Sequence, residues 1–176
     1  MTDDLAARVR DTLRAIPDFP QPGILFRDIT PLLTSSGLLP RLVTWLAEQC
    51  TARRADRIAC IESRGFLFGA PLAERLNLPL ALIRKPGKLP YRTIRQDYAL
   101  EYGSDALEIH ADACAPGDRV VLIDDVLATG GTANAACELI EKLDAEVAAV
   151  LFVLELGELD GRTLLHDRPC LSLTEV

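Results

Sequence analysis

The sequence has few of the residues that build metal centres, disulfide frameworks or nucleic-acid surfaces. It holds two histidines and five scattered cysteines with no CxxC pair, so neither a protein metal site nor a disulfide framework is expected. Lysine and arginine number 19 against 26 aspartates and glutamates, and this negative balance disfavours binding to nucleic acids. No apolar run reaches the roughly 18 residues of a membrane span, and the acidic start is unlike a signal peptide. The sequence therefore predicts a soluble cytoplasmic protein with reduced thiols.

Short apolar segments alternate with helical patterns along much of the chain, whose 176 residues fit one globular domain. Helices are expected near residues 2–16, 38–53, 65–76 and 132–143. Strands buried on both faces are expected at residues 58–61, 78–83, 120–123 and 147–154. This alternation predicts an α/β fold with a mostly parallel sheet flanked by helices. Residues 87–103 interrupt it and are expected to form a lid loop, with a solvated β-hairpin as the alternative.

The most informative motif lies between residues 120 and 132. An apolar strand is expected to end, exposed, at Asp124 and Asp125, and a turn of small residues then leads into a helix: Ala128, Thr129, Gly130, Gly131 and Thr132. Free N–H groups at a helix start, close backbone approach at glycine and threonine hydroxyls all favour a phosphate. The two carboxylates suit the hydroxyls of a ribose. No GxxxxGKS/T or GxGxxG pattern occurs, so the motif predicts a sugar-phosphate site rather than a P-loop or a dinucleotide site.

This motif resembles the donor-binding signature of the type I phosphoribosyltransferases. Further segments resemble the adenine phosphoribosyltransferases of that family: FPQPGILFRDI at residues 19–29, ESRGF at 62–66, IRKPGKLP at 83–90 and LEYG at 100–103. The resemblance implies the type I phosphoribosyltransferase fold with a flexible catalytic loop, in which residues 1–35 form a helix and a small purine-binding hood and residues 36–176 form the core. It also implies a purine salvage enzyme that transfers ribose 5-phosphate from phosphoribosyl pyrophosphate to adenine, giving AMP and pyrophosphate.

The resemblance further implies roles for individual residues. Asp124 and Asp125 are expected to hold the ribose hydroxyls, and residues 128–132 the 5-phosphate. The expected pyrophosphate site comprises Ser63, Arg64, Gly65, Lys85 and Lys88, with Arg64 also acting in catalysis. The expected adenine pocket comprises Leu25, Phe26, Arg27 and Leu127. Glu101 is expected to be the catalytic base, and Tyr102 to cover the ribose when the loop closes. Mg²⁺ is expected to arrive on the donor with few protein ligands, and the protein is expected to be a homodimer.

Two alternatives remain open at this point. A phosphoribosyltransferase for hypoxanthine, guanine or xanthine would share the donor motif, but is not expected to share the FPxPGxxFRD segment. A non-catalytic regulator that senses phosphoribosyl pyrophosphate would need a DNA-binding module, and the acidic amino-terminal segment offers no basic recognition helix.

Overall fold

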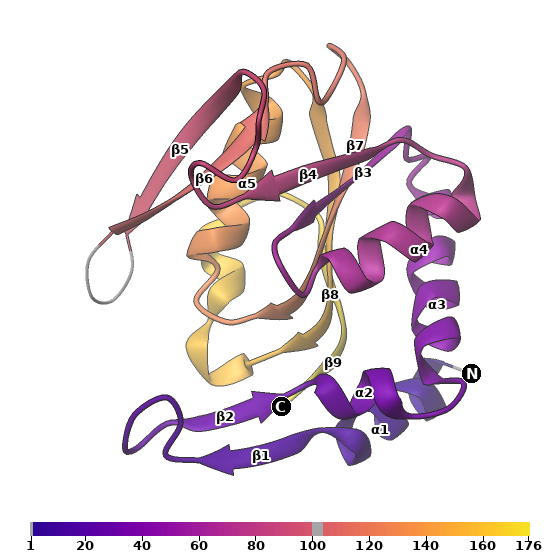
Figure 1. The fold of residues 1–176 in the computed structure, drawn as a ribbon. Helices are drawn as coiled ribbons and strands as arrows, with labels where there is room; N and C mark the ends of the chain where they lie inside the picture. Colours follow the sequence, from indigo (N-terminus) through magenta and orange to yellow (C-terminus); the bar gives the residue numbers. More distant parts are fainter. Residues whose placement is uncertain (1, 100–103) are drawn as a thin grey trace.

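A seven-stranded sheet forms the centre of the molecule, which the computed structural model describes over residues 2–99 and 104–176 (Figure 1). The strand order is β5-β6-β4-β3-β7-β8-β9. The bounds are β3 (Arg57–Ile61), β4 (Leu80–Arg84), β5 (Thr93–Ala99), β6 (Ser104–His110), β7 (Arg119–Leu127), β8 (Glu146–Glu155) and β9 (Cys170–Glu175). Strands β4, β3, β7, β8 and β9 run parallel, while β6 pairs antiparallel with both β4 and β5. The predicted α/β fold with a mostly parallel sheet is confirmed.

Helices cover both faces of this sheet. They are α1 (Thr2–Thr12), α2 (Thr30–Thr34), α3 (Leu38–Ala52), α4 (Phe66–Leu76) and α5 (Gly131–Glu141), followed by the 3-10 turns η1 (Gly157–Leu159) and η2 (Gly161–Leu165). Alternate residues of β7 point to opposite faces. Val121 and Ile123 belong to the core shared with α3 and α4, whereas Val120 and Leu122 belong to the core shared with α5. This double burial explains why the strands read as continuous apolar runs.

The amino-terminal segment differs from the prediction of one helix to residue 16. Helix α1 ends at Thr12, and the following residues form β1 (Arg14–Pro17), which pairs antiparallel with β2 (Leu25–Asp28). Ile16 lies opposite Phe26 in this hairpin. A residue that precedes a proline is disfavoured in helical conformation, so Pro17 keeps Ile16 extended although its spacing continues the helical pattern.

The prediction of a loop over residues 87–103 was wrong for residues 93–99, whereas the role as a lid stays a prediction. Residues 93–99 form β5, whose residues pair with β6 up to Ala99 opposite Ser104. Ile94, Gln96 and Tyr98 are half-buried, whereas Arg95 and Asp97 between them are exposed, as in a strand with one covered face. The hairpin alternative therefore describes this segment better. Glu101 and Tyr102 lie outside the described residues.

Across residues 2–99 and 104–176, the structure contains no helix that is both long enough and apolar enough to cross a membrane.

Candidate active site

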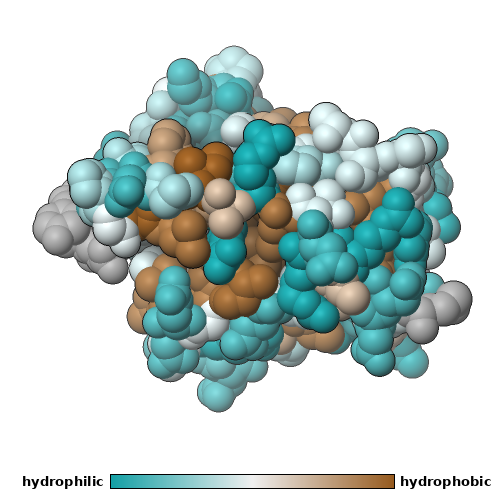
Figure 2. Space-filling view, turned by 90° about the horizontal axis from the view of Figure 1, so that it is seen from below, coloured by the Kyte–Doolittle hydropathy of each residue, from teal (hydrophilic) through white to brown (hydrophobic). Residues whose placement is uncertain are grey.

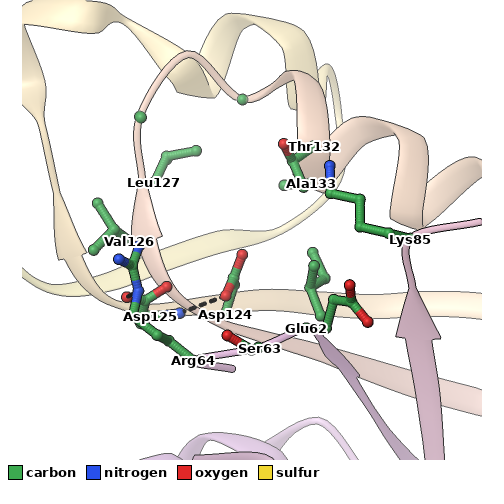
Figure 3. Close-up of a pocket in the computed structure, with 13 residues that line it drawn as sticks. Glu62, Ser63, Arg64, Lys85, Asp124, Asp125, Val126, Leu127, Thr132 and Ala133 are labelled. Carbon is green, nitrogen blue, oxygen red and sulfur yellow. Dashed lines mark hydrogen bonds and ion pairs between the residues drawn. The ribbon is translucent and has the colours of Figure 1, made fainter. Parts of the chain in front are cut away.

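A cavity of about 390 Å³ lies where β3, β4 and β7 end and α5 begins (Figure 3). Its lining comprises Ile61, Glu62, Ser63 and Arg64 after β3, Lys85 after β4, Asp124, Asp125, Val126, Leu127 and Ala128 along β7, and Gly130, Thr132 and Ala133 around the start of α5. The carboxyl ends of parallel strands are the usual place for a ligand in an open α/β sheet. Most of the donor-site residues predicted from the sequence are therefore brought together here.

The adjacent carboxylates lie within β7, which corrects the prediction that the strand ends at them, exposed. Pairing with β3 stops at Ile123, but pairing with β8 continues to Leu127. Strand β8 is longer than β3 and holds the β7 backbone extended past the carboxylates. Asp125 is only 3% exposed as a result. Since β3 is too short to pair with Asp124, that residue lines the cavity.

Charge in the cavity is concentrated on Asp124, Asp125 and Arg64. Nε of Arg64 lies 2.5 Å from Oδ2 of Asp125; the contact is an ion pair rather than an aligned hydrogen bond, since this oxygen accepts none from the described residues. The backbone N–H of Asp125 donates to Oδ1 of Asp124 at 2.9 Å, the dashed line in Figure 3. Burial and the neighbouring Asp125 raise the pKa of Asp124 well above its ordinary value, and the nearby Arg64 charge offsets this only in part. Such a pair gains most from a ligand that donates hydroxyl hydrogens.

The turn between β3 and α4 packs directly under Asp124. Gly65 has no room for a side chain, because a Cβ there would lie 2.5 Å from the Ile61 carbonyl oxygen and 3.0 Å from Oδ1 of Asp124. Ser63 and Arg64 precede it and line the cavity, whereas Gly65 itself forms the start of α4. Glu62 also lines the cavity and accepts a 2.5 Å hydrogen bond from Nε of Arg84. Sequence reasoning assigned no role to Glu62, although its place beside Ser63 in the same motif was a signal.

The glycine-rich turn delivers the start of α5 to the opposite side of the cavity. Gly130 has a φ of 84° and is the residue before the helix, a conformation that favours glycine. Thr132 in the first helical turn lines the cavity together with Ala128, so unpaired N–H groups of a helix start face it. Thr129 is exposed, and neither it nor Gly131 lines the cavity. The turn can bind an anion mainly through backbone N–H groups.

Lys85 enters the cavity from β4 and is held by the β5–β6 hairpin. Its Nζ donates to the Tyr98 hydroxyl at 2.9 Å and forms an ion pair with Asp105, and Thr132 Oγ1 donates to the same hydroxyl at 3.3 Å. Burial alone would lower the pKa of Lys85, but its hydrogen bonds to Asp105 and Tyr98 raise the pKa overall. Lys88 is exposed and does not line the cavity. Tyr98 and Asp105 were not predicted from the sequence. They hold Lys85, and Tyr98 links it to Thr132 at the start of α5.

The predicted adenine segment lies on the β1–β2 hairpin and does not line this cavity, although Leu127 does. Leu25 is 49% exposed, and Phe26 and Arg27 are half-buried. The ring of Phe26 packs edge-on against Phe19 with centroids 5.1 Å apart. Figure 2 views the molecule from the hairpin's side and shows apolar surface between polar side chains. The hairpin can therefore offer apolar side chains to a flat ligand.

The family pattern described as the phosphoribosyl transferase domain matches residues 36–172. The chain belongs to the phosphoribosyltransferase family.

It is 55% identical over 160 residues to the adenine phosphoribosyltransferase of Carboxydothermus hydrogenoformans, covering 91% of this chain and 94% of that one. The crystal structure of adenine phosphoribosyltransferase from Thermoanaerobacter pseudethanolicus is similar with a TM-score of 0.93 and 47% identity, over 97% of this chain and 99% of that one. The Saccharomyces cerevisiae enzyme, complexed with adenine and an imino-altritol bisphosphate, has a TM-score of 0.90 and 40% identity over 97% and 99%. These relatives confirm the resemblance inferred from the motifs.

Oxygen ligands for a cation are few at this phosphoribosyltransferase site. Within residues 2–99 and 104–176, no group of three or more His, Cys, Asp or Glu side chains could hold a metal. Asp124 and Asp125 offer carboxylate oxygens, which suit Mg²⁺, an ion that usually keeps several waters and binds through one or two carboxylates plus substrate phosphates. The residues present therefore fit a cation that is shared with a phosphorylated substrate.

Proposed function

We propose that this chain is an adenine phosphoribosyltransferase that transfers ribose 5-phosphate from phosphoribosyl pyrophosphate to adenine. The observation that carries the proposal is one cavity in which two adjacent carboxylates face a glycine-bounded helix start, with Arg64 at its edge. This donor set is complementary to a sugar diol next to a phosphate. The curated relatives that carry the name of this activity are 55% and 52% identical to this chain over nearly their full length.

On the donor side, each part of the cavity takes one part of the substrate. Asp124 and Asp125 accept the ribose hydroxyls, and residues 128–132, glycines and threonines included, bind the 5-phosphate. The diphosphate lies towards the ends of β3 and β4, where Ser63, Arg64 and Gly65 bind it. Lys85 exchanges its ion pair with Asp105 for one with the diphosphate. Lys88 binds the diphosphate from outside the cavity. Mg²⁺ would arrive on the donor; carboxylate oxygens of Asp124 and Asp125 would help to hold it, and it would supply positive charge for the leaving pyrophosphate.

On the acceptor side, the β1–β2 hairpin supplies the base site. Backbone groups at Leu25 and Arg27 pair with the adenine edge, and Phe26 packs on its face with Leu127 beneath. N9 forms its bond to the anomeric carbon as the bond to the pyrophosphate oxygen breaks, and the imidazole proton passes from N7 to the Glu101 carboxylate. Tyr102 covers the ribose and limits water access. Both Glu101 and Tyr102 lie outside the described residues.

We also propose that the enzyme works in the cytoplasm as a homodimer. Residues 1–176 act as one domain, in which residues 1–35 supply the purine-binding hood and residues 36–176 the core. The reduced thiols support the location, since Cys50, Cys60, Cys114 and Cys137 are buried and no disulfide joins the cysteines.

A panel of bases tests the activity. With labelled adenine and phosphoribosyl pyrophosphate, AMP and pyrophosphate should form in equal amounts. The kcat/KM for adenine should exceed that for hypoxanthine, guanine or xanthine by about a hundredfold or more, because mismatched buried donors and acceptors are costly. Equal turnover of hypoxanthine would establish a different base specificity. Donor binding without turnover of any base would establish a sensor instead of an enzyme.

A further inference from the structure

The backbone segment 157–165, which contains η1 and η2, packs against the glycine-rich turn at residues 128–130. A Cβ on Gly130 would collide with the Gly161 carbonyl oxygen, and a Cβ on Gly161 would collide with the Ala128 carbonyl oxygen and lie 3.0 Å from the Gly130 nitrogen. The two backbones therefore touch with no side chain between them. A shift of Gly161 must move the turn or open a gap behind it.

Gly161 is followed by Arg162, whose guanidinium fixes the segment to the end of the sheet. Nε of Arg162 donates to Oε1 of Glu155 at 2.6 Å, and a terminal nitrogen donates to Oε2 at 2.5 Å. The other terminal nitrogen donates to the Cys170 carbonyl at 2.8 Å. Glu155 is 5% exposed and ends β8, opposite Leu127 in β7. A two-point ion pair, in which the Glu155 side chain is buried and the Arg162 side chain is 45% exposed, thus connects the last residue of β8 to the segment behind the turn that follows β7.

Such a half-exposed ion pair is weak evidence for stability, because solvent screens the arginine and burial of the carboxylate costs desolvation. Its planar two-bond geometry, however, restricts position and direction. We infer that Arg162, held by Glu155, is a positioning residue that sets the phosphate turn of residues 128–130 for the 5-phosphate. This inference rests on the proposed function, since that function assigns the turn to the 5-phosphate.

The same strand pair contains a natural control at its other end. Arg119 at the start of β7 bonds both oxygens of Glu146 at the start of β8, at 2.7 and 2.8 Å. This pair has the same chemistry and a similarly exposed arginine, but its glutamate is 56% exposed where Glu155 is buried, and it lies at the opposite end of the strands from the cavity. Any general effect of losing an arginine–glutamate pair from β7 and β8 should also appear there.

The experiment compares Arg162→Met with Arg119→Met by calorimetry. AMP probes the 5-phosphate site, whereas pyrophosphate and adenine carry no 5-phosphate. Arg162→Met should weaken AMP binding by about ten- to a hundredfold, the scale of losing one hydrogen bond to a charged phosphate, and leave the affinities for pyrophosphate and adenine within about twofold. Arg162→Lys should recover part of the loss, and Arg119→Met should change none of the three affinities. In turnover, the KM for phosphoribosyl pyrophosphate should rise more than kcat falls.

Loss of Arg162 alone leaves Glu155 buried without its partner and can unfold the segment. The variant Glu155→Leu with Arg162→Met removes both charges and should fold, since replacement of a buried charge together with its partner by apolar residues is often tolerated. If it melts like the wild type and still binds AMP weakly, positioning is supported. If it melts like the wild type and binds AMP normally, the inference is overturned. A wild-type protein that binds neither AMP nor phosphoribosyl pyrophosphate would instead overturn the proposed function.

Discussion

The two halves of the candidate site are built in opposite ways. On the donor half, Asp125 is 3% exposed, and Gly65 has no space for even a methyl group. On the acceptor half, Leu25 and Phe19 are about half exposed on a hairpin whose paired strands have four residues each. The donor half is positioned by the ends of buried strands of the central sheet, while the acceptor half lies on a peripheral two-stranded sheet (Figure 1).

This difference indicates where preorganisation lies. Dipoles and charges fixed by a packed sheet cost little reorganisation when a charged ligand binds or reacts. A short exposed hairpin can adjust to a flat base, at the expense of ordering on binding. Substitutions on the donor half should therefore change affinity for the charged donor steeply, and substitutions on the acceptor half should act more weakly on the base.

The largest effect is expected at Glu101, to which we assign proton transfer and not a place in either binding half. Glu101→Gln keeps the shape of the side chain but cannot take the purine proton. General bases typically contribute about 10² to 10⁴ in rate, so kcat should fall in this range while donor affinity stays constant. The measurement is steady-state kinetics with a pH profile, in which the variant should lack the acidic limb. A near-normal kcat with an unaltered acidic limb would remove Glu101 from the mechanism.

The next effect tests the donor half directly. Replacing both Asp124 and Asp125 by asparagine removes two charged acceptors of ribose hydroxyl groups. A hydrogen bond to a charged group contributes about 1.5–3 kcal/mol, and the neutral amide oxygen keeps about half of it. Affinity for phosphoribosyl pyrophosphate should therefore fall by roughly a hundredfold for the two sites together, while circular dichroism stays unchanged. Asp118→Asn is the matched control, because Asp118 pairs with Arg57 at the amino-terminal ends of β7 and β3, away from the cavity. Unchanged donor affinity in the double variant would show that these carboxylates serve another purpose.

The acceptor half should respond more mildly. Phe26→Ala removes the ring that we assign to the face of adenine, and stacking on a base contributes about 1–3 kcal/mol. The KM for adenine should rise roughly tenfold, with the KM for phosphoribosyl pyrophosphate within about twofold. Phe19→Ala removes the ring that packs on Phe26 and should have a smaller effect in the same direction. A loss of donor affinity at Phe26 as large as at the two aspartates would break the distinction between the halves.

The sequence predicted that Asp124, Asp125 and the glycine-rich turn lie together because these residues are contiguous in the chain. Asp124 to Thr132 form one stretch of chain, and the order of apolar strand, acids, glycines and helix carries the geometry. The burial of Asp125 could not be read in the same way, because it depends on β8 being longer than β3. Strand length is a property of the neighbour as much as of the strand itself.

Contacts between distant segments were also beyond the sequence. The link of Lys85 to Tyr98 and Asp105 depends on the register of the β5–β6 hairpin, in which Tyr98 lies opposite Asp105. A slip of one residue would turn both side chains away. Strand β9 carries alternating leucines and polar residues that were given no assignment, and its parallel pairing with β8 is visible only in the fold.

The smallest effect concerns the free energy of unfolding. It tests whether the buried carboxylates of the donor half destabilise the folded protein. Burial and Asp125 raise the pKa of Asp124 in the folded protein, so ionising it near neutral pH disfavours folding, and this penalty disappears below the pKa of the unfolded chain. Asp124→Asn should therefore raise the free energy of unfolding by about 1 kcal/mol near pH 8, or about 2–4 °C in Tm, and the gain should vanish towards about pH 4.

Asp118→Asn should behave in the opposite way. A backbone hydrogen bond from Ala115 and the partner Arg57 lower the pKa of Asp118, so its charge stabilises the folded state above the unfolded pKa, and that contribution is lost as the pH falls. Thermal melts of both variants and the wild type between about pH 4 and pH 8 measure the two opposite changes in stability. Both substitutions replace a carboxylate by an amide of the same shape. If Asp124→Asn melts below the wild type near pH 8, as Asp118→Asn should, then the Asp124 carboxylate is stabilised by its surroundings, and the donor half does not store free energy for its ligand.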